Sequence, residues 1–381
     1  MAHNNTVLSQ LLSLVSRHEF ESLAKQHHKG QALRKMTRWG QFVSMFVGQV
    51  SGRRSLRDIV TNLDAQKQKL YHSGVGKVSK SSLARVNEQQ PYTLYEALFG
   101  KLLSKCQPHS PKHKFQFKNP LFSMDASTIE LSLSIFPWAK FRQKKGAVKI
   151  HVGLDHNGLI PAFMSLTEGN CHDIIEARKV DLPAGSILAV DRGYNDYEWF
   201  NSMNNKGIFI VSRLKKSANY RVIERRPVNK NLGLTSDQEI KLTSKKGAQY
   251  EGQLRRIGYI CPETGNHYFF LTNNMKLSAK TIASIYKERW QIELFFKWIK
   301  QNLKIKSFVG TSKNAVLTQI WIAMCTYLLM AYIKFTSRIT KAVSEMVRLL
   351  QLNLFDRRNL YDLFSPPIDD EPDKYKQLTM L

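Results

Sequence analysis

Residues 286–300 read YKERWQIELFFKWIK and carry the most informative pattern in the sequence. Counted from Tyr286, the residues Arg289, Glu293 and Lys300 stand at offsets 3, 7 and 14. At about 100° per residue the four side chains fall within about 60° of one another, on one helix face about 21 Å long. Apolar residues occupy an adjacent face, which should pack on a sheet: Ile285, Ile292, Phe295, Phe296 and Ile299. The pattern predicts one helix over 279–303 that presents a carboxylate among cations, although a solvated amphipathic helix with salt bridges has the same pattern.

Two aspartates stand in or directly after apolar segments upstream of this helix. Asp125 lies in FSMDAST at 122–128, and Asp191 follows LAV at 188–190. A carboxylate in such a position is poorly solvated and needs a partner, which a divalent cation would supply. Oxygen ligands without a nearby His or Cys favour Mg²⁺ or Mn²⁺. For either aspartate taken alone, a capped or salt-bridged strand end is the better interpretation.

The spacing Tyr286-x2-Arg289-x3-Glu293-x6-Lys300 resembles the signature of a large group of bacterial insertion-sequence transposases, in all four residues and all three intervals. The resemblance covers about residues 120–335. It implies a ribonuclease-H-like core with an Asp-Asp-Glu triad. Many relatives have Gly directly after the second acid, where this chain has Arg192.

Carried onto this sequence, the resemblance makes Asp125, Asp191 and Glu293 the catalytic acids and the ligands of two metal ions, Mg²⁺ or Mn²⁺. A further stretch, EGNCHD at 168–173, also resembles a family segment, and a role for His172 is left open.

The same resemblance implies that double-stranded DNA is the partner, as the terminal inverted repeats of the element and as target DNA. Tyr286, Arg289 and Lys300 would bind the phosphodiester at the element's end. Relatives act as dimers and cut through a DNA hairpin, in which one base leaves the stack and lies against an aromatic ring. Trp290 and Tyr268 are the candidates for that ring. Packing within a strand is the simpler role for Tyr268.

The hydrophobic pattern divides the chain into five segments and predicts an α/β fold. Residues 1–115 are helical and basic, typical of a DNA-binding region but equally of a helical bundle with a solvated basic face. Residues 116–213 follow the strand and helix order of the first part of a ribonuclease-H-like catalytic core, with strands expected at 121–134, 148–154, 160–166, 187–190 and 208–211. A β-rich insertion is predicted at 214–275, the catalytic helix and the rest of the core at 276–335, and a C-terminal helix with a mobile tail at 336–381. Within 1–115, Ser55 is expected to cap a helix that runs to 62, and another helix is expected at 79–87. Further helices are expected at 173–180, 316–335 and 337–352.

The charge of the chain favours a polyanionic partner. Lys and Arg number 57 against 30 Asp and Glu, for a formal net charge of +27. The N-terminus has no signal-peptide pattern, and the four cysteines have no zinc or disulfide spacing. The apolar run at 320–333 predicts a buried helix and no membrane association. These features fit a protein of the bacterial cytoplasm, associated with the nucleoid.

Two other functions fit parts of the pattern. One is a ribonuclease-H-like nuclease or resolvase that cuts DNA without joining it. The other is a non-catalytic DNA-binding protein, either a repressor or a relic of a transposase. The complete set of three acids argues against the relic.

Overall fold

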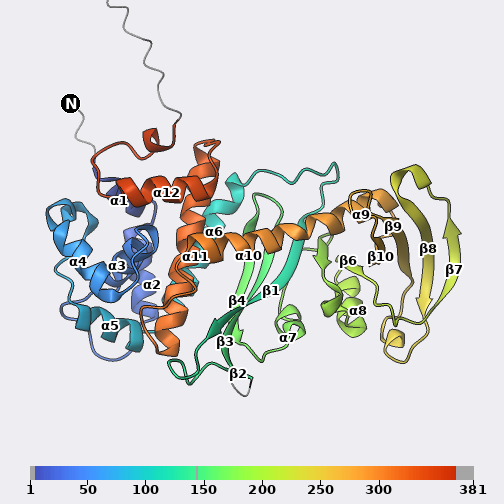
Figure 1. The fold of residues 1–381 in the computed structure, drawn as a ribbon, viewed down its shortest axis with the longest axis horizontal. Helices are drawn as coiled ribbons and strands as arrows, with labels where there is room; N and C mark the ends of the chain where they lie inside the picture. The colour runs from blue at the N-terminus through green and yellow to red at the C-terminus, as the bar shows by residue number, and fades with distance from the viewer. Residues whose placement is uncertain (1–4, 143–144, 366–381) are drawn as a thin grey trace, which may run out of the picture.

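The computed structural model describes residues 5–142 and 145–365, and the predicted tail at 366–381 lies outside them. The fold is mixed α/β, with one large mixed sheet and helices packed against it (Figure 1). Helices from the N-terminal part lie at one end of the molecule, and the last strands of the sheet lie at the other (Figure 1).

The part of the sheet that bears Asp125 and Asp191 has strand β1 (Leu121–Leu131) at its centre. On one side β1 pairs antiparallel with β3 (Lys145–Asp155), which pairs in turn with β4 (Ile160–Glu168) and with the short β2 (Lys140–Arg142). On the other side β1 pairs parallel with β5 (Ile187–Val190), and β5 pairs parallel with β6 (Phe209–Arg213). The sequence predicts β1, β3, β4, β5 and β6 within a few residues of their observed bounds, whereas it did not predict β2.

The β-rich stretch after β6 continues the same sheet. Its strands run in the order β10, β9, β8, β7 outward from β6, and all of these pairs are antiparallel. The strand bounds are Tyr220–Arg226 for β7, Leu234–Leu242 for β8, Leu254–Ile260 for β9 and His267–Thr272 for β10. The strands predicted in this stretch are therefore confirmed.

The helices, in chain order, are α1 (Val7–Ser13), α2 (Arg17–Gln26), α3 (Arg38–Val50), α4 (Leu56–Ala65), α5 (Lys80–Gln89), α6 (Thr93–Cys106), α7 (Asp173–Ala177), α8 (Tyr197–Asn205), α9 (Ala279–Glu288), α10 (Trp290–Asn302), α11 (Lys313–Thr336) and α12 (Val343–Asn353). Ser55 and Ser79 cap α4 and α5 through their hydroxyl oxygens, at the helix starts that the sequence predicts. Two predicted helices are longer than the observed ones. The helix after Asp173 ends at Ala177, and α12 begins at Val343, several residues after the predicted start at 337.

The predicted single helix over 279–303 is wrong, because the chain forms two helices that meet at Arg289. The N–H of Arg289 donates to the carbonyl of Tyr286, and the N–H of Ile292 donates to the carbonyl of Arg289. Both bonds span three residues, so the junction is a tightened turn. Arg289 keeps helical dihedrals, with φ −53° and ψ −27°, and the two helices run on across the sheet (Figure 1).

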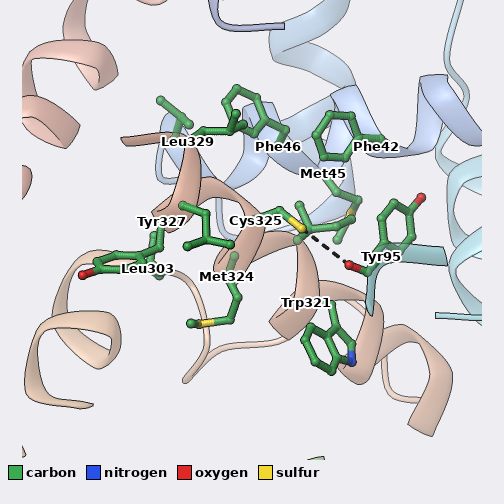
Figure 2. Packing of buried hydrophobic residues seen from close by; sticks show 14 of the residues in the cluster. Phe42, Met45, Phe46, Tyr95, Leu303, Trp321, Met324, Cys325, Tyr327 and Leu329 are labelled. Carbon is green, nitrogen blue, oxygen red and sulfur yellow. Dashed lines mark hydrogen bonds between the residues drawn. The ribbon is translucent and has the colours of Figure 1, made fainter. Parts of the chain in front are cut away.

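Helix α11 connects the N-terminal helices with the sheet. It is apolar and long enough to cross a membrane, yet 94% of its apolar window is buried inside the protein. A helix that is apolar on all sides is a core helix when other elements surround it. Figure 2 shows Trp321, Met324 and Cys325 of α11 packed among side chains of α3 and α6, with the thiol of Cys325 3.5 Å from the carbonyl oxygen of Tyr95.

The same hydrophobic cluster continues from α11 to the sheet. It includes Ile292 and Phe295 of α10 as well as Ile150 and Val152 of β3. The helices of residues 7–106 therefore share one continuous core with the elements that carry Glu293. The apolar face predicted for the catalytic helix is buried as expected.

Candidate active site

The sheet places Asp125 and Asp191 side by side. Met124 of β1 and Val190 of β5 are register partners in a parallel pair, and each aspartate directly follows its partner residue. Residues that alternate with Asp125 and Asp191 along these strands, including Leu121 and Ala189, pack against α9. Both carboxylates therefore face the side of the sheet that α9 and α10 cover.

The junction of α9 and α10 brings the third acid to this pair. The Arg289 guanidinium lies 2.6 Å from Oε1 of Glu293 and 3.6 Å from Oδ2 of Asp125. One turn earlier, the Tyr286 hydroxyl donates to Oδ1 of Asp191 over 3.2 Å. Three acids that lie far apart in the chain thus meet around one cation and one hydroxyl.

The electrostatics of the site follow from burial and from the neighbouring charges. Burial, together with the charges of Glu293 and Asp191, raises the pKa of Asp125 to about 6 against the opposing effects of the Ala126 N–H and Arg289. Burial also raises the pKa of Tyr286 to about 12, with the charge of Asp191 adding to the effect. The site gathers negative charge that Arg289 neutralises only in part. Such a site attracts further cations.

Lys300, on α10, lies over β1 at a position away from the acids. Its ammonium donates to the carbonyl oxygen of Thr128 over 3.0 Å, three residues beyond Asp125 on β1. Burial lowers the pKa of Lys300, and the charge of Lys306 lowers it further. The four signature residues therefore lie along one line over the sheet, although two helices carry them.

Trp290 is the first residue of α10, and its side chain points to solvent. It is 56% exposed, and Leu294, one turn later, is 42% exposed. These two residues form an exposed apolar strip directly beside Glu293. Trp290 is therefore available for contact with a ligand at the site.

Tyr268 lies on β10 and is half-buried. Its ring stacks on Phe270 with centroids 6.1 Å apart, and Phe270 contacts the ring of Tyr286 at 4.9 Å. A row of aromatic rings thus leads from Tyr268 to the residue that binds Asp191. This packing is also what the simpler role as a strand residue requires.

Sequence reasoning missed Arg213, the last residue of β6. Its guanidinium lies 5.0 Å from the centroid of the Tyr268 ring, and its charge lowers the pKa of Tyr286. Because β5 and β6 are parallel, Arg213 and Asp191 stand at the same edge of the sheet. The sequence does carry a signal for Arg213, namely a charged residue at the carboxyl end of an apolar strand. The same signal identified the acids, but it was not applied to arginine.

The segment 168–173 packs behind β3. Asp173 begins α7, accepts a hydrogen bond from Lys149 at 3.0 Å and lies 3.7 Å from the imidazole of His151. His172 is exposed and makes no capping hydrogen bond through its side chain. This segment holds α7 on the sheet and does not contribute His172 to the three acids.

The donor groups at the site suit a hard divalent cation, since all three acids offer oxygen ligands. In the described ranges 5–142 and 145–365, however, no three His, Cys, Asp or Glu side chains stand close enough to hold one ion together. Arg289 lies between Asp125 and Glu293, with its Nε buried and unpaired. The residue types fit a metal site, and Arg289 supplies the positive charge in the arrangement observed.

Comparison with known proteins gives consistent matches. A family model described as a transposase DDE domain matches residues 116–329, and another, described as a domain of unknown function, matches residues 3–76. A putative transposase of Sinorhizobium fredii is 30% identical over 75% of this chain and 80% of its own length. A probable transposase of an insertion sequence element of Geobacillus stearothermophilus is 26% identical over 68% of each chain.

Two further matches are more distant. A putative transposase for an insertion sequence element of Synechocystis is 24% identical over 82% of this chain and 86% of its own length. Among solved structures, a piggyBac transposase synaptic complex with hairpin DNA superposes with a TM-score of 0.46 at 11% identity, over 94% of this chain and 80% of that one.

Proposed function

Because this chain belongs to the DDE transposase family, whose domain model spans residues 116–329, we propose that it cuts DNA at the ends of an insertion sequence and joins those ends to target DNA. The observation that carries the proposal is the meeting of Asp125, Asp191 and Glu293 at the junction of α9 and α10. These three acids would be the catalytic residues.

The proposal includes a ribonuclease-H-like core. The central β1, with β3 and β4 antiparallel on one side and β5 and β6 parallel on the other, supports this assignment. The spacing of Tyr286, Arg289, Glu293 and Lys300 supports membership in the subgroup that has this signature. Arg289 and Lys300 contact β1 directly, and Glu293 contacts Arg289. Tyr286 contacts Asp191, the residue after β5.

The triad residues would hold Mg²⁺ or Mn²⁺, with two ions expected. When bound, such ions activate a water or a DNA 3′-hydroxyl and stabilise the leaving oxygen. Arg289 must release at least one of its two carboxylates before Asp125 and Glu293 can share a ligand. Asp125 must be ionised to bind a cation, and with a pKa of about 6 its carboxyl group is mostly ionised at neutral pH.

The cationic side chains of the site would bind the phosphodiester. Arg289, once released, offers a planar guanidinium suited to a phosphate. The Tyr286 hydroxyl and the Lys300 ammonium face the same side of the sheet. In the absence of DNA, these three groups are held by Asp191, Glu293 and the backbone of β1.

We further propose that cleavage passes through a DNA hairpin. Closing a tight hairpin requires a base to leave the stack, and an aromatic face can recover about 1–3 kcal/mol of the lost stacking. Exposed Trp290 and half-buried Tyr268, with Arg213 against its ring, are the candidates in this chain.

The remaining assignments follow from the same proposal. Residues 1–115 would recognise the terminal inverted repeats, residues 116–213 and 276–335 would form the catalytic core, 214–275 its insertion, and 336–381 a C-terminal extension. Two copies of the chain would pair the two ends of the element in the bacterial cytoplasm. The net charge of +27 supports DNA as the partner.

Replacement of the acids tests the proposal. Asp125→Ala, Asp191→Ala and Glu293→Ala should each abolish nicking and joining of a plasmid that carries the element's ends, while binding of those ends remains. The matched control is Glu198→Ala, which removes an exposed carboxylate on α8 that pairs only with Arg178 among the described residues. A triad variant that nicks like the unmodified protein would contradict the assignment. Joining of a pre-cut end distinguishes a transposase from a nuclease that only cuts.

A further inference from the structure

A groove of about 1320 Å³ lies between the segment 29–36, part of the connection from α2 to α3, and one side of α5 along its whole length. It lies in the N-terminal helical part of the chain, beside α5 at the end of the molecule opposite β7 (Figure 1). Five cations line it: Lys29, Arg34, Lys35, Lys77 and Arg85. Glu88 is the one acid among the described residues of its lining.

These five cations are exposed and lack carboxylate partners. Every one is solvent-exposed, and none forms an ion pair with any acid in the described part of the chain. Cations gathered in a concave surface repel one another and create a positive potential there. A ligand with regularly spaced negative charges would relieve this repulsion.

The floor of the groove is held rigidly. Buried Gln90 donates to the carbonyl of Lys29 at 2.7 Å and accepts from the Lys29 N–H at 3.2 Å. Buried Arg38 donates to Gln90 at 3.3 Å and to the carbonyl of Pro91 at 2.7 Å. Because the backbone at Lys29 is already fixed, a ligand that binds beside it loses little free energy to ordering that residue.

The positive end of α5 opens into the same groove. Ser79 caps the helix by accepting from the Ser82 N–H at 3.2 Å, and Ser79, Ser81 and Ser82 are all lining residues of the groove. A helix N-terminus favours an anion, and hydroxyls can donate to phosphate oxygens. These groups add hydrogen-bond donors to the positive potential of the five cations.

We propose that this groove binds one phosphate backbone of duplex DNA, an inference that rests on the proposed transposase function. No aromatic residue stands among the described residues that line the groove, so it offers no surface on which unpaired bases could stack. Backbone contact with a duplex therefore fits better than binding of a single strand. Sequence reading would come from other surfaces.

The groove is also tied to the catalytic part of the chain. Asn314 in the first turn of α11 donates to the carbonyls of Asn87 at 2.8 Å and Gln90 at 2.6 Å, and it accepts from the N–H of Tyr92 at 3.0 Å. The groove is therefore anchored to α11, which packs against α10. DNA bound in the groove would be held in a fixed position relative to α10.

Salt dependence of binding tests the proposal. The full chain is titrated, in EDTA, against a fluorescent 30-base-pair duplex of random sequence at several KCl concentrations. The plot of log K against log salt has a negative slope, and each lost phosphate contact makes it shallower by about 0.9. The triple variant Lys29→Ala, Lys35→Ala, Lys77→Ala should therefore reduce the size of the slope by about 2.7 and, taken from a 1 M reference, weaken binding about 500-fold at 0.1 M salt.

Two control proteins make the result specific. The triple variant Lys67→Ala, Lys69→Ala, Lys101→Ala removes exposed cations outside the groove and should leave the slope nearly unchanged. Arginine at 29, 35 and 77 keeps the charge and should keep the slope, which separates loss of charge from loss of folding. Equal slopes for the groove variant and the unmodified protein would overturn the proposal, as would equal losses in both alanine triples.

Further outcomes separate this inference from the proposed function. A greater loss with a 30-nucleotide single strand than with the duplex would overturn the duplex assignment. An unmodified protein that binds no DNA would overturn both the groove and the transposase proposals. An unmodified protein that binds and cuts DNA, with a groove variant of unaltered affinity, would overturn the groove alone.

Discussion

The substitution Arg289→Gln should lower the free energy of unfolding of the metal-free protein. It should also increase the stabilisation that the protein gains from Mg²⁺. In the structure Arg289 neutralises Glu293 at 2.6 Å and Asp125 at 3.6 Å, so its removal leaves two carboxylates without their cation. Arg289 is mostly buried and its partners partly so, which places the cost between that of an exposed pair and that of a buried pair, at about 1–3 kcal/mol. The same removal leaves the carboxylates free to bind a divalent ion.

The gain can be worked out as a melting-temperature shift. If Arg289→Gln binds Mg²⁺ tenfold more tightly, saturating Mg²⁺ stabilises it by about 1.4 kcal/mol more than the unmodified protein. For a chain of 381 residues that is a difference of about 2 °C, from the usual unfolding entropy per residue. Thermal unfolding with and without MgCl₂ measures it directly and needs no DNA.

A matched control is Arg178→Gln, since Arg178 also pairs with two carboxylates, Asp196 at 3.1 Å and Glu198 at 2.7 Å. That variant should respond to Mg²⁺ like the unmodified protein. An Arg289→Gln protein whose Mg²⁺ response equals or falls below that of the unmodified protein would show that Arg289 does not compete with a metal ion. The placement of the ion between Asp125 and Glu293 would then be refuted.

Three more predictions follow from other parts of the molecule. Tyr268→Ala should slow hairpin formation about 5- to 150-fold while sparing the first nick, and Tyr268→Trp should be tolerated; a single-turnover gel separates the steps, and equal loss of both would make Tyr268 structural. Burial lowers the pKa of His151 to about 4, so the folded state binds fewer protons than the unfolded state between pH 4 and 6.5, and stability falls as the pH drops through this window. Between pH 8 and pH 5 the free energy of unfolding of His151→Gln should therefore fall by about 2 kcal/mol less than that of the unmodified protein, measured by urea unfolding. An unchanged pH dependence would exclude His151 as the cause. Arg255→Met should cost about 3–5 kcal/mol because it leaves Asp237 buried and unpaired, and adding Asp237→Leu should recover most of that loss in the same assay; no recovery would point to the bond from Arg255 to the Leu277 carbonyl instead.

Much of the fold could be predicted because burial leaves a local pattern. The strand at 187–190 is apolar throughout and is buried throughout, so its bounds were found without error. Ser55 and Ser79 marked helix starts because a hydroxyl before a helical run satisfies a free backbone N–H. Helix ends were less accurate, as at Ala177, where no such local signal marks the stop.

The break at Arg289 could not be predicted, since the residue keeps helical dihedrals and only the hydrogen-bond partners change. The periodic spacing of apolar residues does not reveal a change of backbone hydrogen-bond partners. The pairing of Arg289 with Glu293 follows from a spacing of four residues, but its approach to Asp125 joins positions 164 residues apart and depends on the packing of α10 on the sheet. Arg213 was overlooked because an arginine at a strand end usually has a purely solvated role.

The core that α11 shares with the N-terminal helices and with the β1–β3–β4 part of the sheet has a consequence for where along a duplex DNA would be cut. Since the N-terminal helices and the strand of Asp125 belong to the same hydrophobic core as this buried helix, they cannot move independently without opening that core. A duplex bound by the N-terminal helices would meet the three acids at a fixed number of base pairs from its bound sequence. Inserting base pairs between the two positions would carry the phosphate to be cut away from Asp125. Transplanting the N-terminal helices into another transposase would also require the matching surface of α11.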